Sequence, residues 1–224
     1  MNDQLIIGNK SSFDDFRASV AKRAIGMPAK KSIKETVPFS NKTYEFSNIN
    51  GELYWEEREL EYIFEIIAPT PERLEELKMF FANWVMNVTE EIIQDPYIPD
   101  YHFIGTYDDM ECEDDDGMDK CTITVKFTAY PYKISNLPNV YNIAVPSASE
   151  KTVTVINNSS HRIVPTITTD CAVIITIEGA SYSIGAGEFT DETLMLPAGA
   201  VSVAIQNNGE SDCTMAISFY EEVF

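Results

Sequence analysis

The sequence predicts a mainly β protein with one helix, and three observations carry this prediction. Short runs of alternating apolar and polar residues recur along most of the 224 residues. A single stretch, residues 71–85, instead repeats apolar side chains at helical spacing. Beyond residue 137 only short strand-like runs occur, separated by turns that contain Asn, Pro or Gly. We therefore expect an α+β N-terminal domain over residues 1–137 and an all-β sandwich over residues 138–224.

The N-terminal domain is expected to begin with a short strand near residues 4–7, followed by loops or extended arms. Residues 59–67 then alternate apolar and acidic side chains, which predicts a strand buried on one face. A helix follows, because Thr70 can cap it, Pro71 suits its first position and an apolar stripe continues to Val85.

A hairpin is expected to complete this domain. Residues 101–107 and 122–130 have strand patterns, and the polar residues 111–120 between them form an acidic tip with a glycine. Residues 134–140 interrupt the alternation with Asn and Pro, so we expect a linker there.

The C-terminal domain is expected to be a β-sandwich, since strand-like runs follow one another at short spacing. These runs are residues 152–156, 162–168, 172–178, 181–184, 193–196, 201–206 and 214–220. Pro165 lies within the second run. Because proline cannot donate a ladder hydrogen bond, we expect that strand at a sheet edge or at a bulge.

The net charge of −20 disfavours nucleic acid as a tightly bound partner, because a nucleic-acid binder needs a basic surface. The charge is also unevenly spread. Residues 1–42 carry eight basic and four acidic residues, residues 43–133 carry six and 22, and residues 134–224 carry two and ten. This separation suits a repeated subunit whose basic face meets an acidic face of its neighbour, and it also fits a solvated surface.

The sequence offers few candidate catalytic residues, so we expect no enzyme, no catalytic residue and no cofactor. The two histidines, His102 and His161, fall in different expected domains. The sequence contains no nucleophile elbow, phosphate-binding glycine loop or zinc-protease motif. The abundant carboxylates leave a glycosidase-like pair open without favouring any one pair.

The four cysteines, Cys112, Cys121, Cys171 and Cys213, lack the paired spacing of a zinc site. We interpret them as buried free thiols of a protein made in a reducing compartment. Cys112 and Cys121 flank the acidic tip, so the expected hairpin can place them face to face.

The acidic tip resembles the start of a calcium loop, because acidic residues at positions 114–116 and 119 surround Gly117. Counted from Asp114, the twelfth position holds Val125, where such a loop places a glutamate. We therefore expect a solvated hairpin tip and no metal site.

The order of these features resembles one known family, the siphophage distal tail proteins (Dit family) of phages and prophages. The N-terminal resemblance rests on RELEYIFEII (58–67), PERLEELKMFFANWV (71–85), DPYIPDYHFIG (95–105) and ITVKFTAYPYK (123–133). The last run contains the aromatic ending Tyr130, Pro131 and Tyr132. The second domain resembles the family's galectin-like C-terminal sandwich and closes on MAISFYEEVF (215–224).

The resemblance implies a structural protein of the virion. Its N-terminal domains would form a homo-hexameric ring around a channel, with rings stacked in some cases, and its C-terminal domains would project outward. The ring would act as a baseplate hub for host attachment. It would join the tail tube protein to the tail-associated lysin, the fibre or the receptor-binding proteins, and DNA would pass through it without specific binding.

The implied location is the virion tail tip, after assembly in the bacterial host cytoplasm. The sequence shows no signal peptide and no apolar run long enough for membrane insertion. Three other interpretations stay open: a carbohydrate-binding receptor-recognition protein, another baseplate component, and a wall hydrolase that uses two of the carboxylates.

Overall fold

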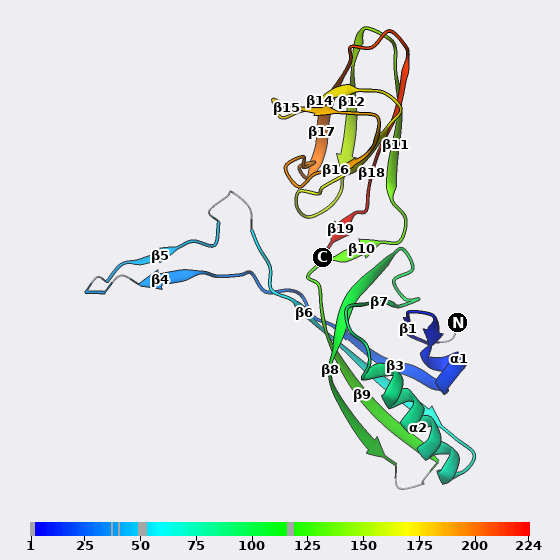
Figure 1. The fold of residues 1–224 in the computed structure, drawn as a ribbon. Helices are drawn as coiled ribbons and strands as arrows, with labels where there is room; N and C mark the ends of the chain where they lie inside the picture. The colour runs from blue at the N-terminus through cyan, green and yellow to red at the C-terminus, as the bar shows by residue number, and fades with distance from the viewer. Residues whose placement is uncertain (1–2, 37, 40, 49–52, 116–118) are drawn as a thin grey trace. The chain divides into compact units, whose positions relative to one another are not determined.

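The computed structural model describes residues 3–36, 38–39, 41–48, 53–115 and 119–224 (Figure 1). The chain divides into two compact units, Met1–Lys133 with Phe224, and Ile134–Val223. Strands dominate both units, which confirms the mainly β fold class. Neither helix of the described residues is long and apolar enough to cross a membrane.

The first unit is built on one antiparallel sheet with the strand order β2-β1-β7-β8-β9-β6-β3. Its strands are β1 (Ile6–Ile7), β2 (Lys10–Ser11), β3 (Ala18–Ile25), β6 (Arg58–Ile67), β7 (Glu91–Gln94), β8 (Tyr101–Asp114) and β9 (Lys120–Ala129). The backbone N–H of Val20 in β3 donates to the carbonyl of Asp3, just before β1, over 2.7 Å. The sheet therefore curls so that a segment near one side bonds to the strand at the other.

The strands β6 and β9 are neighbours within this sheet and confirm the predicted alternation. They pair from Arg58 opposite Ala129 to Ile67 opposite Lys120. Every second side chain is buried: Leu60, Tyr62, Phe64 and Ile66 in β6, and Ile123, Val125 and Phe127 in β9. The period of two directs these side chains to one face, and that face forms the core of the unit.

The predicted helix is α2 (Pro71–Val85), and it covers the buried face of the sheet (Figure 1). The Thr70 hydroxyl accepts a hydrogen bond from Arg73 N over 3.3 Å, as the capping signal predicted. Leu74, Leu77, Phe81 and Val85 are buried against the strands. A short helix, α1 (Ser12–Phe16), was not expected; the Phe16 ring stacks on Trp84 of α2 at 4.8 Å between ring centroids.

Two stretches of the first unit differ from the sequence prediction. The strand β3 occupies part of the region expected to be loops or arms, and it pairs with β6 across a bulge between Val20 and Lys22. The strand β8 extends to Asp114, so the first residues of the expected acidic tip belong to the sheet. Backbone pairing with β9 holds these exposed acidic residues in extended form, from Glu111 opposite Thr124 to Asp114 opposite Cys121.

The second unit is a sandwich of two antiparallel sheets with orders β11-β18-β13-β16 and β12-β17-β14-β15. The strands are β11 (Asn139–Val145), β12 (Ser149–Asn157), β13 (Thr166–Thr169), β14 (Val173–Ile177), β15 (Ala180–Ile184), β16 (Gly187–Thr190), β17 (Gly199–Asn207) and β18 (Cys213–Phe219). The short strands β10 (Lys133–Ser135) and β19 (Glu222–Val223) pair with each other. Apolar side chains from both sheets form one core.

Two buried asparagines fasten loops of this sandwich. Asn157 ends β12 and Asn207 ends β17, and both are fully buried. The Asn207 amide donates to the Ser211 carbonyl over 2.9 Å, and its oxygen accepts from Gly209 N over 2.9 Å. A buried amide whose groups are bonded in this way fixes a turn.

Three expectations for the second half of the chain were wrong. The expected linker, residues 134–140, contains part of β10 and the start of β11, which pairs with β18. Pro165 precedes β13, and β13 is an inner strand between β18 and β16, so the proline occupies no edge. Residues 193–196 form no strand apart from one bridge between Ile163 and Leu196, whereas residues 187–190 do form one.

Candidate functional site

The most unusual surface of the first unit is an arm, residues 26–57, which connects β3 to β6. Its two sides run antiparallel and are joined by backbone hydrogen bonds, including Lys31 N to Tyr54 O and Phe46 N to Ile33 O, both 2.8 Å. The strands β4 (Lys34–Thr36) and β5 (Thr43–Glu45) pair only with each other (Figure 1). The arm is thus a long hairpin inserted between two strands of the main sheet.

The base of the arm is held closely against β6. Gly26 N donates to Glu59 O over 2.9 Å. A Cβ atom at position 26 would lie 2.8 Å from that same carbonyl oxygen, closer than real Cβ contacts. Glycine therefore lets the chain leave β3 against the edge of β6 and enter the arm.

Large apolar side chains of the arm are exposed. They are Met27, Ile33, Phe39, Tyr44, Phe46, Leu53 and Tyr54. The Tyr44 and Phe46 rings stack at 6.5 Å, and the Lys42 ammonium lies 5.1 Å from the Tyr44 ring. A two-stranded hairpin is marginal on its own in water, and exposed apolar groups of this size mark contact surfaces. The arm therefore has the chemistry of an assembly surface.

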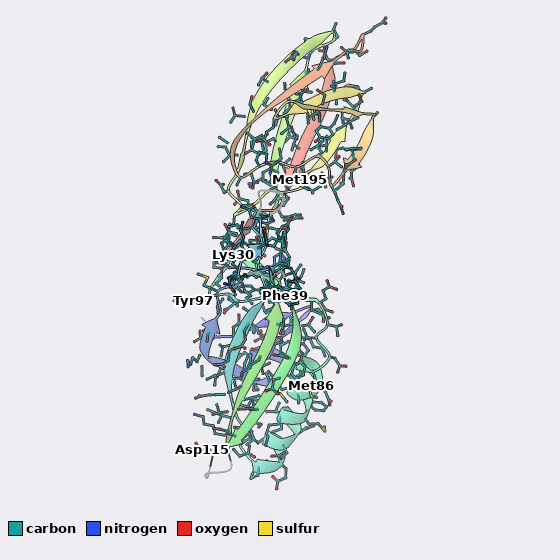
Figure 2. The ribbon with its side chains drawn as sticks, turned by 90° about the vertical axis from the view of Figure 1, so that its left-hand side faces the viewer. Lys30, Phe39, Met86, Tyr97, Asp115 and Met195 are labelled. Carbon is teal, nitrogen blue, oxygen red and sulfur yellow. A yellow bond between two sulfur atoms is a disulfide. The ribbon has the colours of Figure 1, made fainter. Side chains whose placement is uncertain are left out.

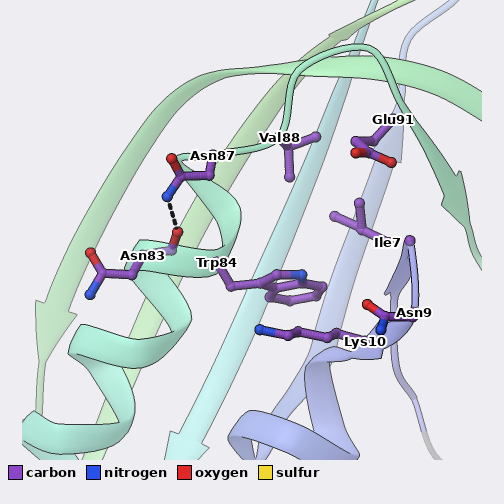
Figure 3. A pocket seen from close by; sticks show the side chains of 9 residues that line it. Ile7, Asn9, Lys10, Asn83, Trp84, Asn87, Val88 and Glu91 are labelled. Atoms are coloured by element: carbon purple, nitrogen blue, oxygen red, sulfur yellow. Dashed lines mark hydrogen bonds between the residues drawn. The ribbon is translucent and has the colours of Figure 1, made fainter.

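A cavity of about 320 Å³ lies between the turn at residues 7–10 and the C-terminal end of α2 (Figure 3). Its lining combines the Trp84 ring with amide, ammonium and carboxylate groups from Asn83, Asn87, Lys10 and Glu91. Asn87 Nδ2 donates to Asn83 O, which orders one wall (Figure 3). The residues that line this cavity include no serine, cysteine or histidine.

The acidic tip is partly neutralised by a lysine from the helix. Lys78 Nζ donates to both carboxylate oxygens of Asp114, over 2.7 and 3.0 Å, and to Glu75 over 2.7 Å. Burial lowers the pKa of Lys78, but its hydrogen bonds to Asp114 and Glu75 outweigh this and raise it. The same contact lowers the pKa of Asp114. Asp114 is therefore already paired with the ammonium group of Lys78.

Only some of the remaining residues of the calcium-like pattern lie within the part of the chain that the structure describes. Asp115 follows the end of β8, at the tip end of the β8–β9 hairpin (Figure 2). Asp116 and Gly117 lie outside the described residues, so the pattern as a whole stays a sequence interpretation.

The cysteines form two pairs, and neither consists of two buried free thiols, as the sequence interpretation expected. Cys171 and Cys213 are joined by a disulfide, so the expectation of free thiols was wrong for them. The disulfide connects the turn after β13 to the start of β18, two elements that the sandwich brings together. Cys112 and Cys121 are free, but Cys112 is exposed, so the expectation of a buried thiol was wrong for it. Their sulfur atoms lie 2.8 Å apart, so they do face each other across the hairpin.

The two histidines lie in separate units. His102 is in β8 of the first unit. His161 is in the second unit, with Nε2 3.2 Å from a carboxylate oxygen of Glu222. The sequence pattern located neither the arm hairpin nor the Lys78–Asp114 contact, because both depend on contacts between segments, and periodicity within one segment does not record them.

No protein-family model matches the sequence, and no curated protein matches it. Among solved structures, the crystal structure of the Dit protein of phage SPP1 aligns with 97% of this chain and 98% of its own, at 14% identity and a TM-score of 0.67. The chain has a Dit fold.

The SPP1 protein is described as a paradigm of the hub adsorption apparatus in phages that infect Gram-positive bacteria. The Dit fold includes both units of the present chain, since the alignment is nearly complete on both sides. One chain in the structure of the phage P2 baseplate in its activated conformation also aligns, over 96% of the present chain and 97% of its own length, at 10% identity. Its TM-score of 0.37 is too low to support a statement about the fold.

Proposed function

We propose that this chain is a structural distal tail protein whose copies form a hexameric ring hub. The hub joins the phage tail tube to the host-adsorption apparatus and lets DNA pass. The Dit fold supports a tail or baseplate role. The arm is the main support for assembly, because it presents exposed apolar side chains that a neighbouring copy can cover.

We assign the two units different parts in this hub. The first unit, with the arm, forms the ring, and the second unit contacts other tail proteins such as the lysin, the fibre or a receptor-binding protein. The acidic excess of residues 43–133 suits a channel wall, because like charge keeps passing DNA from adhering. The protein has no catalytic role in this proposal and resides at the virion tail tip.

Changing the arm surface tests ring formation. We expect the intact chain to elute as a hexamer or dodecamer, at about six or twelve times 25.2 kDa by light scattering. The combined variant Ile33→Ser, Tyr44→Ser and Phe46→Ser should be monomeric but folded, because the arm lies outside the core cluster of the unit.

The matched control is Met86→Ser with Ile92→Ser, which changes exposed apolar residues outside the arm. This control should keep the large assembly. A chain that stays monomeric or trimeric at every concentration, also with the tail tube protein added, would contradict the ring and favour a receptor-binding protein. Equal assembly of both variants would show that the arm is not the contact.

A further inference from the structure

The two free cysteines of the β8–β9 hairpin lie close enough to each other to form a disulfide. Cys112 stands opposite Ile123, and Cys121 stands opposite Asp114, so the two cysteines are diagonal neighbours on the same face of the hairpin. Their sulfur atoms are 2.8 Å apart. A disulfide bond is about 2.05 Å long. Small side-chain rotations are therefore enough to bring the two sulfurs to bonding distance.

The two thiols differ in access. Cys112 is exposed and Cys121 is fully buried. A small oxidant in solvent can reach Cys112, whereas Cys121 is reached only through its neighbour. Burial, followed by the contact with Cys112, raises the pKa of Cys121 and keeps it a thiol at rest. This combination of an exposed attacking thiol and a buried resolving thiol suits a two-step exchange.

A positive charge stands beside the pair. The Lys78 ammonium, fixed by Asp114 and Glu75, interacts electrostatically with both cysteines. An adjacent ammonium stabilises a thiolate as it forms. Because Lys78 comes from α2, the helix contributes to the reactivity of a pair that lies on the strands.

A metal ion is the competing occupant, since Cys112, Asp114 and Cys121 place three ligand atoms within 4.8 Å of one another. However, both oxygens of Asp114 already accept hydrogen bonds from Lys78. A metal ion would have to displace this ammonium or sit beside its charge. The arrangement therefore favours thiol chemistry over metal binding.

We propose that Cys112 and Cys121 are a redox-responsive pair that a small-molecule disulfide, such as glutathione disulfide, converts into a cross-strand disulfide. The Cys112 thiolate attacks one sulfur of the oxidant and releases one thiolate, which leaves a mixed disulfide. The Cys121 thiolate then attacks the Cys112 sulfur and releases the second. Two protein thiols are oxidised, one disulfide is reduced to two thiols, and the two protons pass to the released thiolates.

The closed pair fastens β8 to β9 beside the tip of the hairpin. The bond would form when the protein leaves a reducing cytoplasm, so that the hairpin gains a covalent link only afterwards. This inference does not rest on the proposed ring, because the purified chain alone is enough to test it.

Peptide mapping after glutathione treatment tests the proposal. Trypsin cleavage after Lys78, Lys120 and Lys126 puts Cys112 in the peptide of residues 79–120 and Cys121 in that of residues 121–126. After incubation with glutathione disulfide and alkylation, we expect these two peptides to be covalently joined, and dithiothreitol to separate them. Cys171 and Cys213 share the peptide of residues 163–224, which contains no Lys or Arg, so their disulfide cannot be mistaken for this link.

Two variants complete the test. Cys112→Ser, at an exposed position, should abolish the link while the protein stays folded. Lys78→Gln should slow the formation of the link several-fold, whereas Lys78→Arg should preserve its rate. Linking should also raise the Tm of the intact chain, on the order of 5 °C, because it closes a short loop.

Other outcomes would overturn the proposal. One is glutathione that remains on Cys112 as a mixed disulfide. Another is complete alkylation of both peptides under conditions that oxidise Cys171 and Cys213. Protection of both thiols by zinc alone, reversed by a chelator and without a peptide link, would assign the pair to metal binding instead.

Discussion

At the scale of single residues, the ion pair between Arg23 and Asp95 secures the curl of the first sheet. Arg23 lies in β3, and Asp95 directly follows β7. Arg23 Nε donates to Asp95 Oδ2 over 2.7 Å, and the other oxygen accepts from Tyr97 N over 3.0 Å. The Asp95 side chain is completely buried. The pair therefore joins distant strands through a carboxylate that solvent does not reach.

Replacing Asp95 should destabilise the first unit strongly. Asp95→Ala leaves the Arg23 guanidinium without its buried partner, and such losses cost about 3 to 5 kcal/mol. The matched control is Asp3→Ala, which removes the exposed carboxylate 3.4 Å from the same arginine. It should cost less than about 1 kcal/mol. Urea denaturation measures both, and equal losses would show that burial does not decide the strength of this pair.

At the scale of elements, strong periodicity made prediction possible and irregular pairing made it fail. The helix α2 and the strands β6 and β9 have one buried face each, and their positions were predicted to within one or two residues. The strand β3 was not predicted, because its bulge between Val20 and Lys22 shifts the alternation of apolar and polar residues. The strand β11 was not predicted. It is an edge strand with a partner on one side only, so its sequence is less constrained.

The same reasoning explains how much of the candidate sites the sequence could indicate. The spacing of Cys112 and Cys121 around a polar tip was enough to place them face to face. The arm was expected only as loops or extended arms, because backbone hydrogen bonds between residues 29–36 and 43–56 leave no trace in side-chain pattern. The disulfide between Cys171 and Cys213 spans 42 positions and depends on the sandwich topology.

The helix α2 should owe its docking mainly to Phe81. The Phe81 ring packs against the rings of Phe64, Phe16 and Trp84, with centroids 5.0, 6.0 and 5.7 Å away. Phe81→Ala removes all three contacts and should cost about 3 to 5 kcal/mol of unfolding free energy. The adjacent Phe80 is 46% exposed, so Phe80→Ala should cost less than about 1 kcal/mol. Similar losses in urea denaturation would contradict the packing described here.

At the scale of the whole molecule, the two units have separate cores and should respond separately to damage. The double variant Cys171→Ala and Cys213→Ala opens a loop closed over 42 positions, which should cost the second unit about 4 kcal/mol. Calorimetry should show a lower melting transition for the second unit and an unchanged one for the first. An equal shift of both transitions would indicate that the chain unfolds as one cooperative body.

The arm also has a consequence for the timing of particle construction. Each copy carries a net charge of −20, so two copies repel each other at a distance, while the apolar arm attracts only on contact. Encounters in dilute solution should therefore be unproductive more often than not. A surface that gathers several copies, or a salt that screens their charge, removes that barrier. Rings should then form fastest where a template is already present, and more slowly among free subunits at high concentration or in salt.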